Sequence, residues 1–185
     1  MIIGVDVDGV VADLHQAWLT RYNVEFEDNV RTKDVTDWGI HKFVKPEAQK
    51  RIYEYLHDPS LYLGVQPIEG ALDGIRELHS LGHKIVFISN CNIPMASAKG
   101  KWLEYNGFLK HGPLIPIVGG AIRHGFKKLI SVDVLIDDYQ ENLKDIPGAP
   151  VLFTNDQTPW NHEWRTFFAL KVSGWEDVPP LIKTL

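Results

Sequence analysis

The chain has 185 residues, of which 44% are hydrophobic and 23% charged, and its net charge is −5. This composition supplies enough apolar material for one globular domain with an insertion, without a disulfide or a structural metal. Because the chain is acidic and has one short lysine pair, Lys127 and Lys128, it is a poor candidate for binding polymeric nucleic acid. The negative charge does not exclude binding of small phosphorylated ligands, since a metal ion can supply the missing positive charge.

Three features indicate the compartment in which the protein resides. Cys91 is the only cysteine, so no internal disulfide can form, which is typical of a reducing environment. Met1 leads directly into an apolar run and acidic residues, without the basic segment of a signal peptide. No apolar run approaches the ~18 residues of a membrane helix. We therefore expect a cytoplasmic protein that contacts no membrane, and the sequence leaves a homodimer open.

Short apolar segments alternate with amphipathic ones along most of the chain. Strands separated by helices in this way predict a parallel sheet covered on both faces. The expected elements are, in chain order, a strand at 2–5, a helix through 11–22, a helix at 46–57, a helix at 72–81 stopped by Gly82, a strand at 84–89, a helix around 95–102 with Gly107 at its end, strands at 114–118 and 134–136, a helix around 140–146, a strand at 151–153 and a terminal helix at 175–185.

Residues 14–66 depart from this alternation. They are far more numerous than the ~2–6 residues of a usual loop in an α/β unit. We interpret them as a small, mostly helical cap inserted after the first strand, with an irregular surface excursion as the alternative. The predicted core is then 1–13 and 67–185. The predicted fold class is α/β, with a three-layer, Rossmann-like parallel sheet.

Acidic and polar residues follow the predicted strands. In an open α/β sheet, ligands bind beyond the carboxyl ends of the strands. Two carboxylates ~4 Å apart repel by about 4 kcal/mol at an effective dielectric of ~20, so a cluster of them requires protons or a divalent cation. All-oxygen ligands near a phosphate favour Mg²⁺. The residues at these strand ends are Asp6, Asp8, Ser89, Asn90, Asp137 and Asp138.

These residues resemble the motifs of the haloacid dehalogenase superfamily of phosphatases. Asp6-Val7-Asp8-Gly9 is similar to the first motif of that family, and Val86-Phe87-Ile88-Ser89 to the second. Lys99, on the helix after the second motif, fits the third, and Leu135-Ile136-Asp137-Asp138 is similar to the fourth. The four occur in the order of the family and span nearly the whole predicted core.

The resemblance implies a reaction and a set of roles. Asp6 would attack phosphorus and form an aspartyl-phosphate, while Asp8 would protonate the leaving oxygen and then activate water. Alternate residues of an extended chain point the same way, which suits this pair. Mg²⁺ would be held by Asp6, the backbone carbonyl of Asp8 and Asp138, with Asp137 behind them or exchanging with Asp138. The implied phosphate ligands are Ser89, Asn90 and Lys99.

Within the superfamily, the chain is most similar to the 5'(3')-deoxyribonucleotidase branch. The resemblance rests on residues 8–13, on 67–71 and on the spacing of Lys99 and Trp102. It implies hydrolysis of nucleoside monophosphates whose base is held by cap aromatics. Trp38 and Tyr62 are the candidates for that contact. Two positions depart from the branch, because Leu14 stands where an aromatic is expected and Asn90 where a smaller hydroxyl residue is expected.

Other interpretations of these residues remain. Ser89 could cap the next helix, Lys99 could be solvated while Lys101, Lys127 or Lys128 binds phosphate, and both aromatics could simply pack the cap. The aspartate pairs could form ordinary turns or helix starts. The alternative function is a phosphatase for a sugar phosphate or another small metabolite. A receiver-like signalling domain and a catalytically silent binding protein fit less of the pattern.

Overall fold

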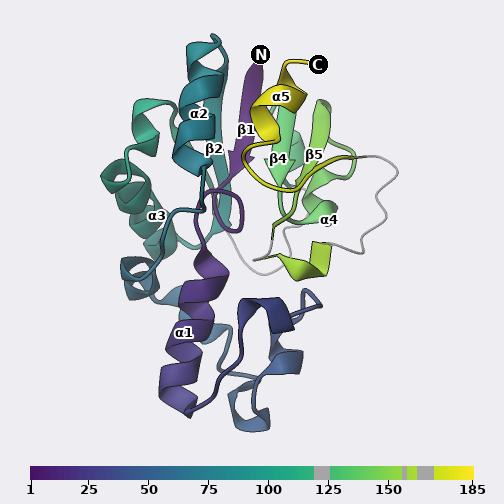
Figure 1. Cartoon of the computed structure of the whole chain (residues 1–185). Coiled ribbons are helices and arrows are strands. Elements are labelled where there is room, and N and C mark those ends of the chain that lie inside the picture. The colour runs from purple at the N-terminus through teal and green to yellow at the C-terminus, as the bar shows by residue number, and fades with distance from the viewer. Residues whose placement is uncertain (119–125, 156–157, 162–168) are drawn as a thin grey trace.

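The computed structural model describes residues 1–118, 126–155, 158–161 and 169–185. Among these residues, six strands form one parallel sheet in the order β3-β2-β1-β4-β5-β6. Helices lie on both sides of the sheet, and the two termini lie at one end of it (Figure 1). The predicted three-layer α/β class is therefore confirmed.

The register of the strands aligns the carboxyl ends of three of them. Central strand β1 pairs with β2 and β4, with Asp6 opposite Ile88 and Val5 opposite Ile136. Strand β6 was not predicted from the sequence, and β2 runs two residues beyond its predicted end. The strands are β1 (Ile2–Asp6), β2 (Lys84–Cys91), β3 (Leu114–Val118), β4 (Val134–Asp137), β5 (Ala149–Phe153) and β6 (Leu170–Val172).

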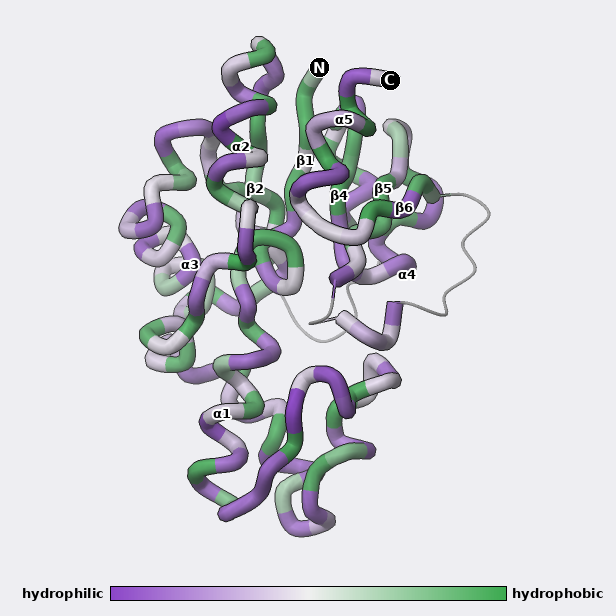
Figure 2. Tube along the Cα trace, viewed as in Figure 1, coloured by the Kyte–Doolittle hydropathy of each residue, from purple (hydrophilic) through white to green (hydrophobic). Residues whose placement is uncertain are grey.

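Alternate strand residues pack on the two faces of the sheet. Ile3, Val5 and Phe87 belong to the larger buried cluster, which also contains side chains of helices α2, α3 and α5. Ile88 and Leu135 belong to the smaller cluster, on the side of helix α4. The strands accordingly carry mostly hydrophobic colours in Figure 2. These helices are α2 (Ala71–Ser80), α3 (Ile93–Tyr105), α4 (Gln140–Leu143) and α5 (Val178–Ile182).

Residues 14–66, which we call the cap segment, lie beyond the carboxyl ends of the strands (Figure 1). They contain helix α1, whose first turn is capped by the Asp13 side chain, and five short 3-10 helices. The division into core and cap remains a prediction. The elements are α1 (Leu14–Phe26), η1 (Thr32–Asp34), η2 (Ile40–Phe43), η3 (Pro46–Ala48), η4 (Glu54–His57) and η5 (Pro59–Leu63).

The prediction of one helix over 46–57 is wrong, because this stretch forms η3 and η4 with turns between them. The carbonyl of Ile52 accepts a hydrogen bond of 2.6 Å from the indole of Trp18. The amide of Leu56, which would bond to that carbonyl in an α-helix, bonds to Tyr53 instead. A backbone carbonyl between η3 and η4 therefore fixes helix α1 through the indole of Trp18.

The two connections between core and cap segment run side by side. The amide of Asp13 donates to the carbonyl of Gln66, and the amide of Ile68 donates to the carbonyl of Val11, both at 2.9 Å. Ala12 and Pro67 form an antiparallel bridge between these bonds. The chain thus leaves and re-enters the core at one point.

The remaining helices are short. The helix predicted around 140–146 ends at Leu143, and the terminal helix covers only Val178–Ile182 of the predicted range. Gly107 has a φ of +83° after α3, as expected for a glycine at a helix end. No helix in the described part of the chain could span a membrane. Short 3-10 helices complete the structure: η6 (Phe108–Lys110), η7 (Phe126–Leu129) and η8 (Pro159–Asn161).

Candidate active site

Three carboxylates meet where strands β1 and β4 end. Asp6 is the last residue of β1, and Asp137 and Asp138 end and follow β4. One ligand oxygen from each lies within 4.8 Å of the others, and all three side chains are buried. The loop after β1 approaches them closely, since Gly9 has a φ of +76° and a Cβ at this position would collide with the carboxylate of Asp138. The structure therefore brings together three of the four acids that the strand pattern placed at one edge, whereas the carboxylate of Asp8 is not part of this group.

This crowding changes the acidity of the cluster. Burial raises the pKa of Asp6 to about 7, and the charges of Asp137 and Asp8 add to the rise, whereas Lys127 opposes it. Burial also raises the pKa of Asp138, with Asp137 and Asp6 as further causes. These carboxyl groups hold protons more tightly than ordinary aspartates do, because their negative charge is poorly compensated.

The donor set of the cluster fits a divalent cation. Oδ2 of Asp138 is buried and accepts no hydrogen bond from the residues that the structure describes. A buried oxygen without a partner carries a desolvation cost that a bound cation would offset. Three aspartates face one lysine here, so an uncompensated negative charge remains. Oxygen ligands of this kind suit Mg²⁺, which Asp6, Asp138 and the backbone carbonyl of Asp8 could hold.

Lys127 lies inside the carboxylate cluster. The sequence suggested this lysine only as an alternative to Lys99 for binding phosphate. Its Nζ atom is 2.8 Å from Asp6 and 2.6 Å from Asp137. Burial acts to lower the pKa of Lys127, but Asp137 and Asp6 outweigh it, so the pKa is raised and the lysine stays charged. Asn142 donates to both oxygens of Asp137 at 3.1 and 3.2 Å. Asp137 is thus held by protein donors, whereas Asp138 is free toward a ligand.

Lys99 joins the predicted phosphate ligands. It is buried, and its Nζ atom donates to Ser89 Oγ at 2.6 Å and to the carbonyl of Asn90 at 3.1 Å. Asn92, and not Ser89, caps helix α3, by accepting the Met95 amide at 2.9 Å. Oδ1 of Asn90 is buried and has no hydrogen-bond partner among the described residues. Of the alternatives to Lys99, Lys101 and Lys128 are exposed.

Asp8 lies between the core and the cap segment. Lys99 donates to its Oδ2 atom, and the hydroxyl of Tyr62 donates to its Oδ1 atom. Tyr62 is therefore buried against the predicted acid and is not among the residues that line the cavity beside it. No local sequence pattern indicates this contact, because Tyr62 and Asp8 are 54 positions apart.

A cavity of about 520 Å³ opens between this cluster and the cap segment. Trp38 lines it, is 40% exposed, and stacks on Tyr139 with 4.1 Å between ring centroids. His15 also lines it, and burial lowers the pKa of this side chain to about 4, so its ring is neutral at neutral pH. The residues around the cavity are Asp6, Asp8, Leu14, His15, Trp18, Trp38, Tyr53, Leu56, His57, Ser89, Asn90, Cys91, Asn92, Met95, Lys99, Asp138, Tyr139 and Asn142.

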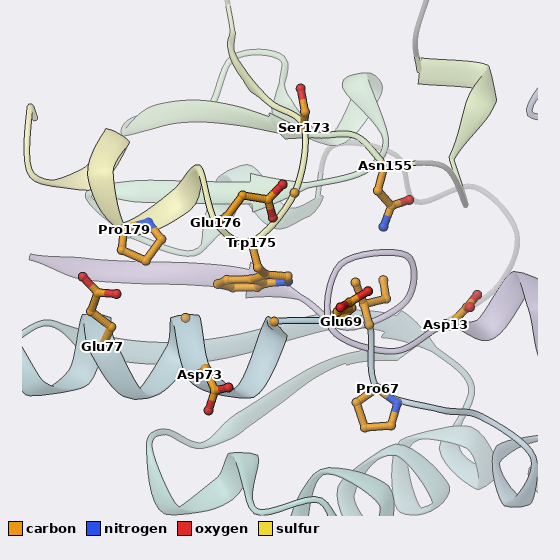
Figure 3. Close-up of a pocket in the computed structure, with 14 residues that line it drawn as sticks. Asp13, Pro67, Glu69, Asp73, Glu77, Asn155, Ser173, Trp175, Glu176 and Pro179 are labelled. Atoms are coloured by element: carbon orange, nitrogen blue, oxygen red, sulfur yellow. The ribbon is translucent and has the colours of Figure 1, made fainter.

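A hollow of about 860 Å³ lies elsewhere and contains none of the predicted site residues. Figure 3 shows Trp175 at its centre, with Asp73 and Glu77 of helix α2 beside it. These two acids pair with Arg76 and Lys183. The indole of Trp175 donates to the carbonyl of Val10 at 2.7 Å, so this region supports the loop that follows β1.

Fold and site together define a phosphatase of the haloacid dehalogenase superfamily. The structure resembles a predicted phosphatase from Clostridium acetobutylicum, with a TM-score of 0.68 and 10% identity over 100% of this chain and 98% of that one. It also resembles a haloacid dehalogenase family hydrolase from Deinococcus radiodurans with bound phosphate and sodium. That TM-score is 0.67 at 16% identity, over 99% and 95% of the two chains. At these identities the likeness shows the fold.

Similar sequences identify the family within this superfamily to which the chain belongs. The family model described as "5' nucleotidase, deoxy (Pyrimidine), cytosolic type C protein" matches residues 1–185. A 5'(3')-deoxyribonucleotidase from C. acetobutylicum is 33% identical over 153 residues, covering 82% of this chain and 80% of the relative. Another from Bacillus subtilis is 29% identical over 179 residues, covering 96% and 95%. The chain belongs to this nucleotidase family and is a phosphatase of the 5'-nucleotidase type, as the motifs predicted.

Proposed function

We propose that the protein is a Mg²⁺-dependent 5'(3')-deoxyribonucleotidase that hydrolyses nucleoside monophosphates through an aspartyl-phosphate on Asp6. One observation carries the proposal: a buried acidic cluster faces a cavity that is lined by aromatic rings on the side of the cap segment. The acidic cluster suits phosphoryl transfer. The aromatic rings that line the cavity on the side of the cap segment, which we call the aromatic wall, suit stacking against a planar base. The names of the sequence relatives support the same substrate class.

The proposed reaction has two steps. In the first, a carboxylate oxygen of Asp6 forms a bond to phosphorus while the ester P–O bond breaks. The electron pair of that bond stays with the leaving oxygen, which takes a proton from the carboxyl group of Asp8. In the second, water attacks phosphorus, gives a proton to Asp8 and displaces Asp6. The products are the alcohol and inorganic phosphate, and both aspartates return to their starting states.

The phosphoryl group would be bound by neighbouring donors. Lys99 and Ser89 already share a hydrogen bond, and both can turn to phosphoryl oxygens. Asn90 would contribute by donating from its Nδ2 amide group, because a phosphoryl oxygen accepts hydrogen bonds. Bound magnesium, held by Asp6, Asp138 and the carbonyl of Asp8, would supply the positive charge that stabilises the transferring group.

The base would lie against the aromatic wall of the cavity. Stacking of a base on an aromatic ring contributes about 1–3 kcal/mol. Trp38 offers such a ring, already supported from behind by Tyr139. His15 adds one donor and one acceptor, because its ring is neutral and makes no hydrogen bond within the described part of the chain.

The test is phosphate release from a panel of substrates, with Mg²⁺ and with chelator. The panel contains deoxyribo- and ribonucleoside 5'- and 3'-monophosphates, sugar phosphates and p-nitrophenyl phosphate. We expect Mg²⁺-dependent turnover with the highest kcat/KM on a deoxynucleotide, and its loss in Asp6→Asn. A preference for sugar phosphates, or no nucleotide faster than the aryl ester, would overturn the substrate assignment.

A further inference from the structure

Tyr62 reaches from the cap segment to the acid that the proposed reaction requires. It lies in η5, its side chain is buried, and its hydroxyl donates to Oδ1 of Asp8. Lys99 of helix α3 donates to the other oxygen, Oδ2. Each oxygen of this carboxylate is therefore held by a different part of the chain.

The ring of Tyr62 is fixed on the core side as well. It meets Trp102 of α3 edge-on, with 6.1 Å between ring centroids and 80° between ring planes. The indole of Trp102 in turn donates to the carbonyl of Val65 at 3.0 Å, which ties α3 to the end of the cap segment. Lys99 lies 6.0 Å from the Tyr62 ring centroid. The phenol thus has little freedom to leave Asp8 while the cap segment is in place.

The two oxygens of Asp8 face different surroundings. Oδ2 shares Lys99 with Ser89, whose hydroxyl is a proposed phosphate ligand, so Oδ2 is on the side of the reacting ester. Oδ1 is turned toward η5 and the phenol. Proton transfer to the leaving oxygen requires the proton on Oδ2, aimed at the ester. A hydrogen bond at Oδ1 prevents rotation of the carboxyl group about its Cβ–Cγ bond.

We propose that Tyr62 is a positioning residue that aims the Asp8 carboxyl group at the leaving oxygen. This inference rests on the proposed role of Asp8 as general acid. It gives the cap segment a part in the chemical step, because the acid is aligned only when η5 lies against α3. It also replaces the predicted contact between Tyr62 and the base.

The effect of removing the Tyr62 hydroxyl should depend on the leaving group. An alkoxide is a poor leaving group and needs the proton of Asp8 as the ester P–O bond breaks. A p-nitrophenolate leaves as the anion and needs no proton. Loss of the Tyr62 hydroxyl should therefore slow alkyl esters selectively. A purely structural defect would slow both classes by the same factor.

The experiment compares Tyr62→Phe with wild type in Mg²⁺ on glycerol 2-phosphate, an alkyl ester, and on p-nitrophenyl phosphate. We expect kcat/KM to fall about tenfold for the alkyl ester and less than about twofold for the aryl ester. Since kcat/KM includes only steps up to aspartyl-phosphate formation, later water activation by Asp8 does not enter. The ratio of the two values within one preparation is independent of how much of the variant is folded.

Tyr55→Phe is the matched control. Tyr55 is also buried in the cap segment, and its hydroxyl donates to Glu25 at 2.5 Å. We expect the alkyl-to-aryl ratio of this variant to equal that of wild type. Equal losses on both esters in Tyr62→Phe, or no loss on either, would overturn the inference. Because neither ester contains a base, a failure of the nucleotide assignment leaves this test intact.

Discussion

Lys127 donates to Asp6 and Asp137 from a position with 1% solvent exposure. Removing one partner of a buried ion pair typically costs about 3–5 kcal/mol, because the remaining charge is left uncompensated. We therefore expect Lys127→Met to lower the free energy of unfolding by about that amount. Urea denaturation in the presence of chelator measures the loss.

The adjacent lysine provides the control. Lys128 is exposed, and the same substitution there should change the unfolding free energy by no more than about 0.5 kcal/mol. Equal losses at the two positions would show that the cluster does not depend on the charge of Lys127. Addition of Mg²⁺ should restore part of the stability of Lys127→Met, because it supplies a replacement cation.

The raised pKa of Asp6 predicts how magnesium and pH interact. With a folded pKa of about 7 against an ordinary 3.8, the folded state holds more protons than the unfolded state between those values. The unfolding free energy from this group therefore falls as pH rises through that window. Magnesium binds the deprotonated carboxylate, so its stabilising effect should grow with pH. We expect a larger Mg²⁺-induced rise in Tm at about pH 8 than at about pH 5, and an equal rise would contradict the proposed ligands.

Trp38 should affect binding of a base without affecting the chemistry. If a base stacks on it, Trp38→Ala should raise KM for nucleotides by about tenfold or more while kcat changes little. A phosphate ester without a base, such as glycerol 2-phosphate, is the internal control. If KM rises equally for both substrates, Trp38 maintains the shape of the cavity and does not bind the base.

At the scale of elements, two helical glycines differ in their surroundings. A Cβ on Gly74 of α2 would lie 2.5 Å from Cε3 of Trp175. For a Cβ on Gly100 of α3, the nearest described atom beyond the backbone of its own helix would be Cδ2 of Leu114, at 3.9 Å. Alanine in a helix interior is favoured over glycine by about 1 kcal/mol. We expect Gly100→Ala to stabilise the protein by up to that amount.

Gly74→Ala should have the opposite sign. The new methyl group would push the indole of Trp175, whose hydrogen bond to Val10 supports the loop after β1. Overpacking of this kind costs about 1–3 kcal/mol, which exceeds the gain in helix propensity. Thermal unfolding of both variants gives the two signs. Stabilisation by both would show that Trp175 moves without cost.

The elements that the sequence predicts well are those with an unambiguous apolar pattern. Helix α2 has apolar residues at helical spacing, and the central strands β1 and β4 are unbroken apolar runs, as expected for strands buried on both faces of a sheet. The helix expected over 46–57 satisfied the same helical spacing, but a distant indole captures the carbonyl of Ile52. Strand β6 has three residues, too few to show alternation. Local patterns failed where a tertiary contact or a short length decided the structure.

The residues of the site likewise fall into those that could be predicted from sequence and those that could not. Asp6, Asp137 and Asp138 could be placed together from sequence, because parallel strands carry their end residues to one edge. Lys127 reaches the cluster from η7, for which no periodic signal exists. The contact of Tyr62 with Asp8 depends on how the cap segment lies on α3, which no local pattern encodes.

At the scale of the whole molecule, the paired connections at Asp13–Gln66 and Val11–Ile68 support the prediction that residues 14–66 form a separate insert. Its ends are already adjacent, so a tight turn could join Ala12 to Pro67 without moving the sheet. Such a shortened chain should keep the far-ultraviolet circular dichroism spectrum of an α/β protein. It should still cleave p-nitrophenyl phosphate slowly but lose discrimination among larger esters. The same geometry would allow one cap segment to be replaced by another during evolution while the catalytic core stays unchanged. Substrate selectivity and bond cleavage can then change independently.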